Sequence, residues 1–246
     1  MIKQQKFYNK TDLHKFIYKG GKIMNYRIAL DGPSGAGKST IAKRLSAELG
    51  FVYVDTGAMY RTVGLYCLQN NVDINDEAAV GAVLGNINIE LKYIDGEQRI
   101  LLNGTDVSKD IRLNEVSMAA SKTSAYKAVR AFLLDAQRNV AKTQSVIMDG
   151  RDIGTVVLPD AEIKIFIVGD ATVRAKRRHK ELQEKGQNIS LQEVLEDIIT
   201  RDHNDTNRAE APLKQAKDAV LLDTTYKNFD EAYEAVLDIV KSKMAQ

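Results

Sequence analysis

The stretch Gly32-Pro33-Ser34-Gly35-Ala36-Gly37-Lys38-Ser39 matches G-x-x-x-x-G-K-[ST], the pattern of a phosphate-binding loop. An apolar, β-branched run at 26–31 precedes it, and apolar residues recurring three and four apart follow Lys38, so the loop connects a predicted strand to a predicted helix. Glycines let consecutive backbone N–H groups turn toward a phosphate. Lys38 can reach the β- and γ-oxygens, and Ser39 can ligate Mg²⁺. The loop predicts ATP or GTP binding and leaves the phosphoryl acceptor open.

The rest of the chain alternates short apolar runs with longer segments of helical period. This pattern predicts an α/β fold of three layers around a five-stranded parallel sheet. The predicted strands are 26–31, 51–55, 145–149, 163–168 and 220–222. The predicted helices begin at Lys38, Gly57, Glu115, Lys127, Ala171, Leu191 and Phe229.

Two segments interrupt this alternation. Residues 87–93 alternate apolar and polar side chains, and the turn-forming pairs Asp95-Gly96 and Asn103-Gly104 flank a second run at 98–102. A small antiparallel β insert is therefore predicted at about 84–112, with a surface embellishment as the alternative. The highly charged segment at about 174–190 contains Gly186 and predicts a mobile helical flap.

Bulk properties restrict the class of protein. The chain has 246 residues and a formal net charge of +2, which favours small phosphorylated ligands over nucleic acid. The one cysteine, Cys67, excludes an intramolecular disulfide and is expected to be a buried structural thiol. Without an apolar run of ~20 residues, no membrane partner is expected. We expect a cytoplasmic monomer.

The first 23 residues differ in character from the remainder. Residues 1–23 have mixed charge, no apolar core of signal-peptide length and no clear periodicity. We expect a poorly structured extension, with Met24 as the natural start and a single folded domain at 24–246.

Polar residues at predicted strand ends indicate where an acceptor binds. The second strand runs into Thr56 and Arg61, which places both near the carboxyl edge of the sheet beside the phosphate loop. The third strand ends at Asp149, whose carboxylate can hold Mg²⁺-bound water. Arg151 is expected to face phosphate. Asp152 either serves the site or caps a helix.

Arginines form a second theme. A guanidinium presents a fork of donors that matches phosphate oxygens. Arg201 and Arg208 lie seven residues apart and would share one face of a continuing helix, although a solvated face paired with Asp202 and Asp205 is an equal alternative. The flap adds Arg174, Arg177 and Arg178.

Taken together, these motifs resemble the bacterial cytidylate kinase family. The resemblance rests on G-P-S-G-A-G-K-S-T at 32–40, D-T-G-A-M-Y-R at 55–61, A-A-S at 119–121, D-G-R-D-I-G-T-V-V-L-P-D-A at 149–161 and R-D-H-N-D-T-N-R-A-x-A-P-L at 201–213. It implies a nucleoside monophosphate kinase with a core, a flap called the LID and an enlarged monophosphate-binding region that contains the insert. The implied reaction moves the γ-phosphoryl of ATP to CMP or dCMP, with Mg²⁺.

The resemblance also implies roles for individual residues. Ser121 and Arg130 would read cytosine, and Thr56 stands where relatives carry Ser. The implied CMP contacts are Thr56, Arg61, Ser121, Arg130, Arg151, Asp152, Arg201 and Arg208. The implied ATP contacts are Gly32, Pro33, Ser34, Gly35, Ala36, Gly37, Lys38, Ser39, Thr40 and Arg178. Lys38, Arg151, Asp152, Arg201 and Arg208 would be catalytic, and Ser39 and Asp149 would serve the metal.

Two other kinds of protein remain as alternatives. A kinase of the same fold could act on shikimate or on another monophosphate. A GTPase switch would need a guanine-reading N-K-x-D after the phosphate loop, whereas Asn9-Lys10-Thr11-Asp12 precedes it. A nucleic-acid-binding role is weaker still because the net charge is near zero.

Overall fold

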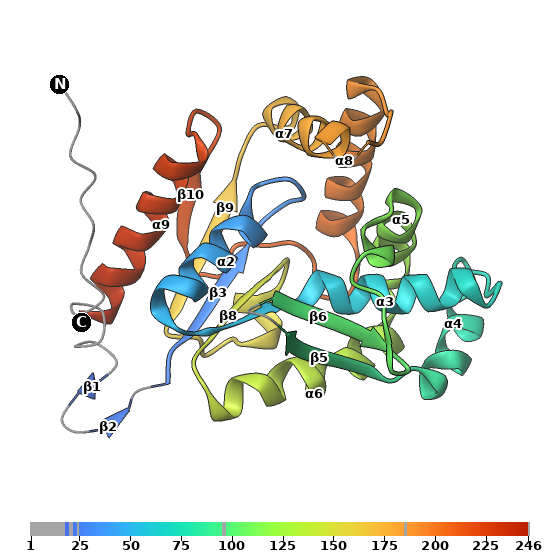
Figure 1. The fold of residues 1–246 in the computed structure, drawn as a ribbon, viewed down its shortest axis with the longest axis horizontal. Coiled ribbons are helices and arrows are strands. Elements are labelled where there is room, and N and C mark those ends of the chain that lie inside the picture. Colours follow the sequence, from blue (N-terminus) through green and yellow to red (C-terminus); the bar gives the residue numbers. More distant parts are fainter. Residues whose placement is uncertain (1–17, 20–21, 24, 95–96, 185, 246) are drawn as a thin grey trace.

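The computed structural model describes residues 18–19, 22–23, 25–94, 97–184 and 186–245. Its centre is a five-stranded sheet in the order β10-β9-β3-β8-β4, with every neighbouring pair parallel (Figure 1). This confirms the predicted α/β fold. The strands are β3 (Arg27–Asp31), β4 (Val52–Asp55), β8 (Val146–Gly150), β9 (Ile163–Val168) and β10 (Val220–Asp223).

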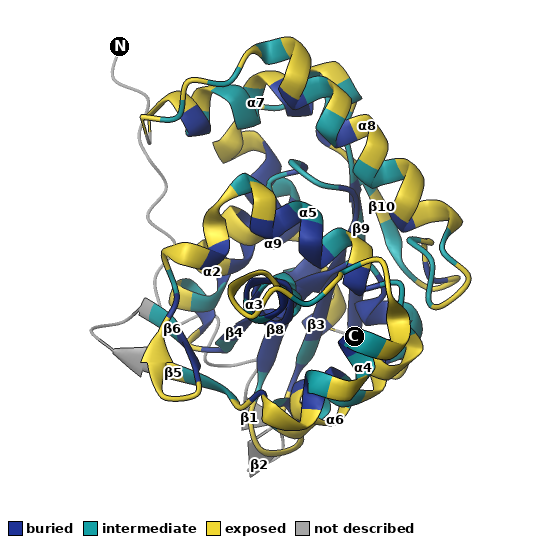
Figure 2. Ribbon diagram, turned by 90° about the vertical axis from the view of Figure 1, so that its right-hand side faces the viewer, coloured by how far each residue is buried: buried dark blue, intermediate teal, exposed yellow. Residues whose placement is uncertain are grey.

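Helices cover both faces of this sheet. In β3, Ile28 and Leu30 pack with α2 and α9, whereas Ala29 faces the cluster that includes α6. The central strands are accordingly buried (Figure 2). The predicted helix starts are confirmed to within one residue, and α4 was not predicted. The helices are α2 (Lys38–Leu49), α3 (Thr56–Gln69), α4 (Glu77–Val83), α5 (Asn114–Thr123), α6 (Lys127–Thr143), α7 (Ala171–Glu184), α8 (Leu191–Asn207) and α9 (Phe229–Met244).

The β insert lies between β4 and β8, as predicted. It is an antiparallel sheet in the order β5-β6-β7, and a 3₁₀ turn at Asp110–Arg112 follows it. Asn103 and Gly104 have φ values of 50° and 85°, the left-handed pair that a tight hairpin needs. The other predicted turn, Asp95-Gly96, lies outside the described residues. The strands are β5 (Ile89–Ile94), β6 (Glu97–Leu102) and β7 (Thr105–Asp106).

The insert and α3 share a hydrophobic core. Ile100 and Leu102 of β6 pack in one cluster with Met59 and Val63 of α3, and Cys67 is fully buried there, as expected. Burial of these apolar side chains thus fixes the insert against α3.

Little of the N-terminal extension is described. Within 1–23, only β1 (Tyr18–Lys19) and β2 (Lys22–Ile23) are, and these two pair antiparallel. The expected lack of structure in the rest, and Asn9-Lys10-Thr11-Asp12, fall outside the described residues. None of the helices in the described ranges combines the length and apolar character that a bilayer crossing requires.

A buried carboxylate ties the end of β3 to the segment after β8. Asp31 is 4% exposed, and its two oxygens accept hydrogen bonds from the backbone N–H groups of Ile153 (2.8 Å) and Gly154 (2.7 Å). These donors open a π-helical turn at Ile153–Val157 that the sequence did not predict. Burial raises the pKa of Asp31 to about 6; nearby Asp152 raises it further and Lys38 opposes the shift.

The pKa of Asp31 predicts a pH-dependent stability. Because the folded value lies above the ordinary one, Asp31 stabilises the fold below about pH 4, and this contribution is lost as the pH rises through 6. Asp31→Asn cannot titrate at this position. The unfolding free energy of the variant minus that of the wild type should therefore increase by roughly 2–3 kcal/mol when the pH is raised from 4 to 7. Urea unfolding of both proteins at the two pH values measures this. A difference independent of pH would contradict it.

Candidate active site

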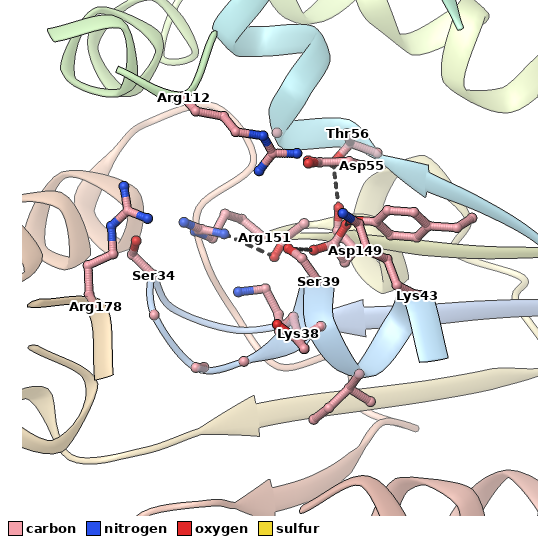
Figure 3. Close-up of a pocket in the computed structure, with 18 of the residues that line it drawn as sticks. Ser34, Lys38, Ser39, Lys43, Asp55, Thr56, Arg112, Asp149, Arg151 and Arg178 are labelled. Atoms are coloured by element: carbon pink, nitrogen blue, oxygen red, sulfur yellow. Dashed lines mark hydrogen bonds between the residues drawn. The ribbon is translucent and has the colours of Figure 1, made fainter. Parts of the chain in front are cut away.

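A cleft of about 1410 Å³ lies along the carboxyl ends of the parallel strands. Its walls come from the phosphate loop, the start of α3, the end of α5, the end of β8, the insert and helices α7 and α8. In Figure 3 the side chains of Arg112, Arg151 and Arg178 approach the space around the phosphate loop from different elements. The cleft therefore collects positive charge from segments that are distant in sequence.

The phosphate loop adopts the shape that its glycines predict. Gly35 and Gly37 have φ values of 73° and 85°, and a Cβ on Gly32 would lie 2.0 Å from the Ile167 carbonyl oxygen. Residues 34–40 line the cleft, whereas Gly32 and Pro33, the first two residues of the loop, are not part of its lining. Close packing against β9 thus fixes the base of the loop.

Lys38 is held at the bottom of the cleft. It is 5% exposed, and its Nζ donates to the Pro33 carbonyl oxygen at 2.7 Å. Burial lowers the pKa of Lys38 to about 7, and the charge of Arg151 acts in the same direction. The Lys38 ammonium is therefore placed where it can pair with a phosphate of a bound nucleotide.

Ser39 and Asp149 meet, as their predicted shared role in metal binding requires. Ser39 Oγ donates to Asp149 Oδ2 at 2.5 Å, and the Tyr53 hydroxyl donates to Oδ1 at 3.0 Å. Asp149 is 4% exposed, and burial raises its pKa to about 6. A hydroxyl and a carboxylate beside a phosphate loop are hard oxygen donors that fit Mg²⁺. Across the described part of the chain, three or more His, Cys, Asp or Glu side chains do not gather at one point.

Thr56 and Arg61, in the first turns of α3, also line the cleft. Thr56 Oγ1 donates to the Asp149 carbonyl oxygen at 2.7 Å, and Arg61 Nη2 donates to Asp55 Oδ2 at 2.9 Å. Asp55 also accepts from the Ala58 N–H at 2.8 Å and so caps α3. Arg61 Nε is buried and makes no hydrogen bond within the described residues. Asp55 orients the guanidinium and leaves this donor for a ligand.

The segment after β8 contributes two ion pairs. Arg151 Nε donates to Asp205 Oδ2 at 2.7 Å, and Asp152 pairs with Arg130 and, at 3.4 Å, with Arg208. Although Asp152 precedes the π-helical turn, its side chain makes no capping bond there. The helix-cap alternative for Asp152 is therefore wrong.

Arg201 and Arg208 both line the cleft. Helix α8 ends at Asn207, so Arg208 follows the helix instead of continuing it. The solvated-face alternative fails because Asp205 is 6% exposed and holds Arg151. Arg201 Nε is buried and finds no acceptor in the described ranges. Burial lowers the pKa of Arg201 to about 10, and Arg151 adds to this effect.

The two residues implied in base reading differ in position. Ser121 lines the cleft, and its Oγ is buried without a hydrogen-bond partner in the described part of the protein. Arg130 lies outside the cleft lining, where it contacts Asp152 and donates to the Ser124 carbonyl oxygen at 3.3 Å. The Ser121 hydroxyl can thus contact a ligand directly, whereas Arg130 forms an ion pair with Asp152, which itself lines the cleft.

The flap arginines differ in their hydrogen-bond partners. Arg177 Nη2 donates to the carbonyl oxygens of Thr224 and Lys227, at 2.7 and 2.9 Å. Arg178 lines the cleft and pairs with Glu181 at 2.9 Å on the same helix.

Several residues that line the cleft were not predicted as site residues. Asp205 belongs to the arginine-rich motif, but the sequence suggested it only as a surface partner. Tyr60 follows the end of β4 closely, which could have signalled it. The insert supplies Gln98 and Arg112, and the loop before α9 supplies Thr224, Lys227 and Asn228. These last two groups lie far from any motif, and only the fold brings them to the cleft.

Comparison with known proteins decides the family. The family model described as cytidylate kinase matches residues 28–242. The chain belongs to the cytidylate kinase family. A cytidylate kinase of Thermosipho melanesiensis is 49% identical over 89% of this chain and 99% of its own. One from Lactobacillus johnsonii is 46% identical over 90% of this chain and 97% of its own.

Similarity to solved structures extends to proteins of other sequence. An uncharacterized protein from Eubacterium ventriosum superposes with a TM-score of 0.50 at 14% identity, covering 89% of this chain and 99% of that one. At this identity the likeness concerns the fold alone.

Arg201 has a buried Nε without a partner among the described residues of this cytidylate kinase family member. Replacing Arg201 should therefore weaken anion binding without lowering the stability of the fold. In Arg201→Met, free energy of unfolding should be unchanged or up to about 1 kcal/mol higher, because a buried, incompletely paired charge is removed at similar volume. The stabilisation that sulfate gives the wild type should fall. Arg177→Met, the matched control, should lose about 1–3 kcal/mol because the partly buried carbonyl groups of Thr224 and Lys227 lose their donor.

Urea unfolding with and without sulfate measures both effects. Equal destabilisation by the two substitutions, with the sulfate response intact in Arg201→Met, would show that Arg201 is a structural residue.

Proposed function

We propose that this protein transfers the γ-phosphoryl group of ATP to CMP or dCMP, giving ADP and CDP or dCDP. The observation that carries the proposal is a set of buried donors on residues that line the cleft. Arg61 Nε, Ser121 Oγ and Arg201 Nε have no hydrogen-bond partner within the described residues. Buried polar groups are nearly always satisfied, so such a set is expected where a ligand belongs.

ATP would occupy the part of the cleft at the phosphate loop. Lys38 and the loop N–H groups would hold the β- and γ-phosphates, and Arg178 would approach them from the LID. The cleft continues past α2 to Thr224 and Lys227, which leaves room for the base of ATP on that side. Ser39 and Asp149 would hold Mg²⁺, which supplies charge neutralisation on the transferring phosphates.

The acceptor would lie on the side of α3 and α5. Arg61, Arg151 and Arg201 would surround its phosphate, because all three line the cleft and, besides burial, the nearby charges of Arg151 and Arg61 lower the pKa of Arg201. Ser121 would face the base, and Asp152, held by Arg130 and Arg208, would face the ribose. The Thr56 hydroxyl, which donates to the Asp149 carbonyl oxygen, would lie near the acceptor phosphate.

Transfer requires two polyanions to approach in line. An oxygen of the acceptor phosphate forms a bond to the γ-phosphorus, while the bond from that phosphorus to the β,γ-bridging oxygen breaks and ADP leaves. The acceptor oxygen is already anionic, so positioning and charge neutralisation carry the step. Lys38, Arg151 and Arg201 would offset the repulsion, and exclusion of water by the LID would prevent hydrolysis of ATP.

We infer further that the protein acts in the cytoplasm as a monomer. One chain supplies residues to both ends of the cleft, so no second subunit is needed to complete it. Gel filtration with light scattering measures the state, and a dimer mass would contradict this inference.

A panel of acceptors tests the proposed function. With saturating ATP and Mg²⁺, CMP and dCMP should give kcat/KM at least about tenfold above UMP, AMP and shikimate, since a mismatched base leaves buried polar groups unpaired. A coupled ADP assay measures the rates. Preference for AMP or shikimate would favour another kinase of this fold, and GTP hydrolysis without acceptor dependence would favour a switch protein.

Ser121 should contribute to choice of base more than to transfer. In Ser121→Ala, the ratio of kcat/KM for CMP over UMP should fall roughly tenfold, the size expected for one lost hydrogen bond. The kcat with CMP should stay within about threefold. Thr123→Val, which removes a hydroxyl of the same helix that bonds the Ala119 carbonyl oxygen outside the cleft lining, is the matched control. An unchanged CMP/UMP ratio in Ser121→Ala would remove this residue from base recognition.

A further inference from the structure

The arginine-rich motif at 201–208 contains an acidic residue that the proposed function does not use. Arg201, Asp205 and Arg208 line the cleft, whereas Asp202 does not. The Asp202 carboxylate instead points to α7, where its Oδ2 lies 2.6 Å from Arg174 Nη2. The Arg174 side chain is only 6% exposed. An ion pair thus joins α7, at the start of the LID, to α8, which follows the LID.

This ion pair also holds the phosphate loop. Arg174 Nη1 donates to the Ser34 carbonyl oxygen at 2.8 Å, and the Ser34 N–H donates to Asp202 Oδ1 at 3.4 Å. Both backbone polar groups of one loop residue are therefore bonded to the two members of a single ion pair. We call Arg174, Asp202 and Ser34 the loop clamp.

The remaining donors of Arg174 show that it is not poised for a phosphate. Its Nε donates to the Gly169 carbonyl oxygen at 2.7 Å, at the end of β9. All three guanidinium nitrogens thus have protein partners. Arg178, on the same helix, faces the cleft instead. Arg174 is suited to fix positions, not to follow the transferring group.

Packing makes the contact between loop and LID close. A Cβ on Gly35 would lie 3.3 Å from Arg174 Cβ and 3.6 Å from Ile198 Cδ1. In Figure 1 the loop between β3 and α2 reaches toward α7 and α8. Gly35 follows Ser34 directly, so a change in the clamp would move the first N–H groups of the phosphate cradle. Arg174 also neutralises the carboxylate of Asp202, which would otherwise repel a triphosphate.

We propose that Arg174 and Asp202 are positioning residues that set the shape of the phosphate loop for ATP through Ser34, and so couple the loop to the LID. This inference rests on the proposed use of ATP as donor. It assigns no contact between either side chain and the nucleotide.

Kinetics of clamp variants test the inference. In Asp202→Ala the KM for ATP should rise about tenfold, equivalent to roughly 1.4 kcal/mol, while the KM for CMP stays within about twofold. Asp202→Asn should raise the KM for ATP by about threefold to tenfold, because its single amide oxygen can accept from either the Ser34 N–H or Arg174 but not from both. Glu196→Ala, on the exposed face of the same helix and bonded to Gln192, is the matched control and should equal the wild type.

A second variant carries the test if Asp202→Ala does not fold. Arg174→Lys keeps the charge beside Asp202 but cannot donate to three acceptors in a fixed fork, so its KM for ATP should rise about fivefold. An unchanged KM for ATP in the folded variant, or equal increases for ATP and CMP, would overturn the inference. If the wild type shows no CMP-dependent turnover, the proposed acceptor is wrong, and calorimetric Kd values for ATP then test the clamp by the same ratios.

Discussion

Removing a cation from water is unfavourable unless an anion compensates for the lost hydration, and the cleft places this constraint on several groups at once. Lys38 and Arg201 are buried enough that their pKa values fall, to about 7 and about 10. Arg151 contributes to both shifts because the three cations are close together. Positive charge is thus concentrated in the cleft, and binding of an anion such as a nucleotide phosphate would compensate for the lost hydration of these cations.

The acidic residues of the cleft determine how these cations are oriented. Asp55 pairs with Arg61, Asp205 pairs with Arg151, and Asp152 pairs with Arg208. The fold brings these pairs together because the parallel strands end at one edge. Asp31 then connects the phosphate loop to the segment of Arg151 and Asp152 through two backbone N–H groups. Preorganisation of this kind lets electrostatic stabilisation act without rearrangement during transfer.

The sequence pattern within a segment was sufficient to predict the elements whose structure is determined by nearby residues. The phosphate loop, all five parallel strands, most helix starts and the Asn103-Gly104 turn follow from spacing and turn chemistry. Helix α4 is short, and the turn at Ile153–Val157 depends on Asp31, more than 120 residues away in sequence, so neither has a local signal.

The division of labour among arginines could not be predicted either. Residue type gives the number of donors, but the partner of each donor depends on tertiary structure. Arg174 and Arg177 bond to backbone carbonyl groups, whereas Arg178 pairs with Glu181 on its own helix. Arg177 and Arg178 line the cleft, and Arg174 does not. Gln98 and Arg112 reach the cleft only because the insert packs on α3.

The most direct test of the proposed nucleotide sites is a crystal structure with CMP and a non-hydrolysable ATP analogue. The account predicts phosphate oxygens within hydrogen-bonding distance of Arg61 Nε and Arg201 Nε. A ternary complex in which both groups stay without a phosphate contact would contradict it.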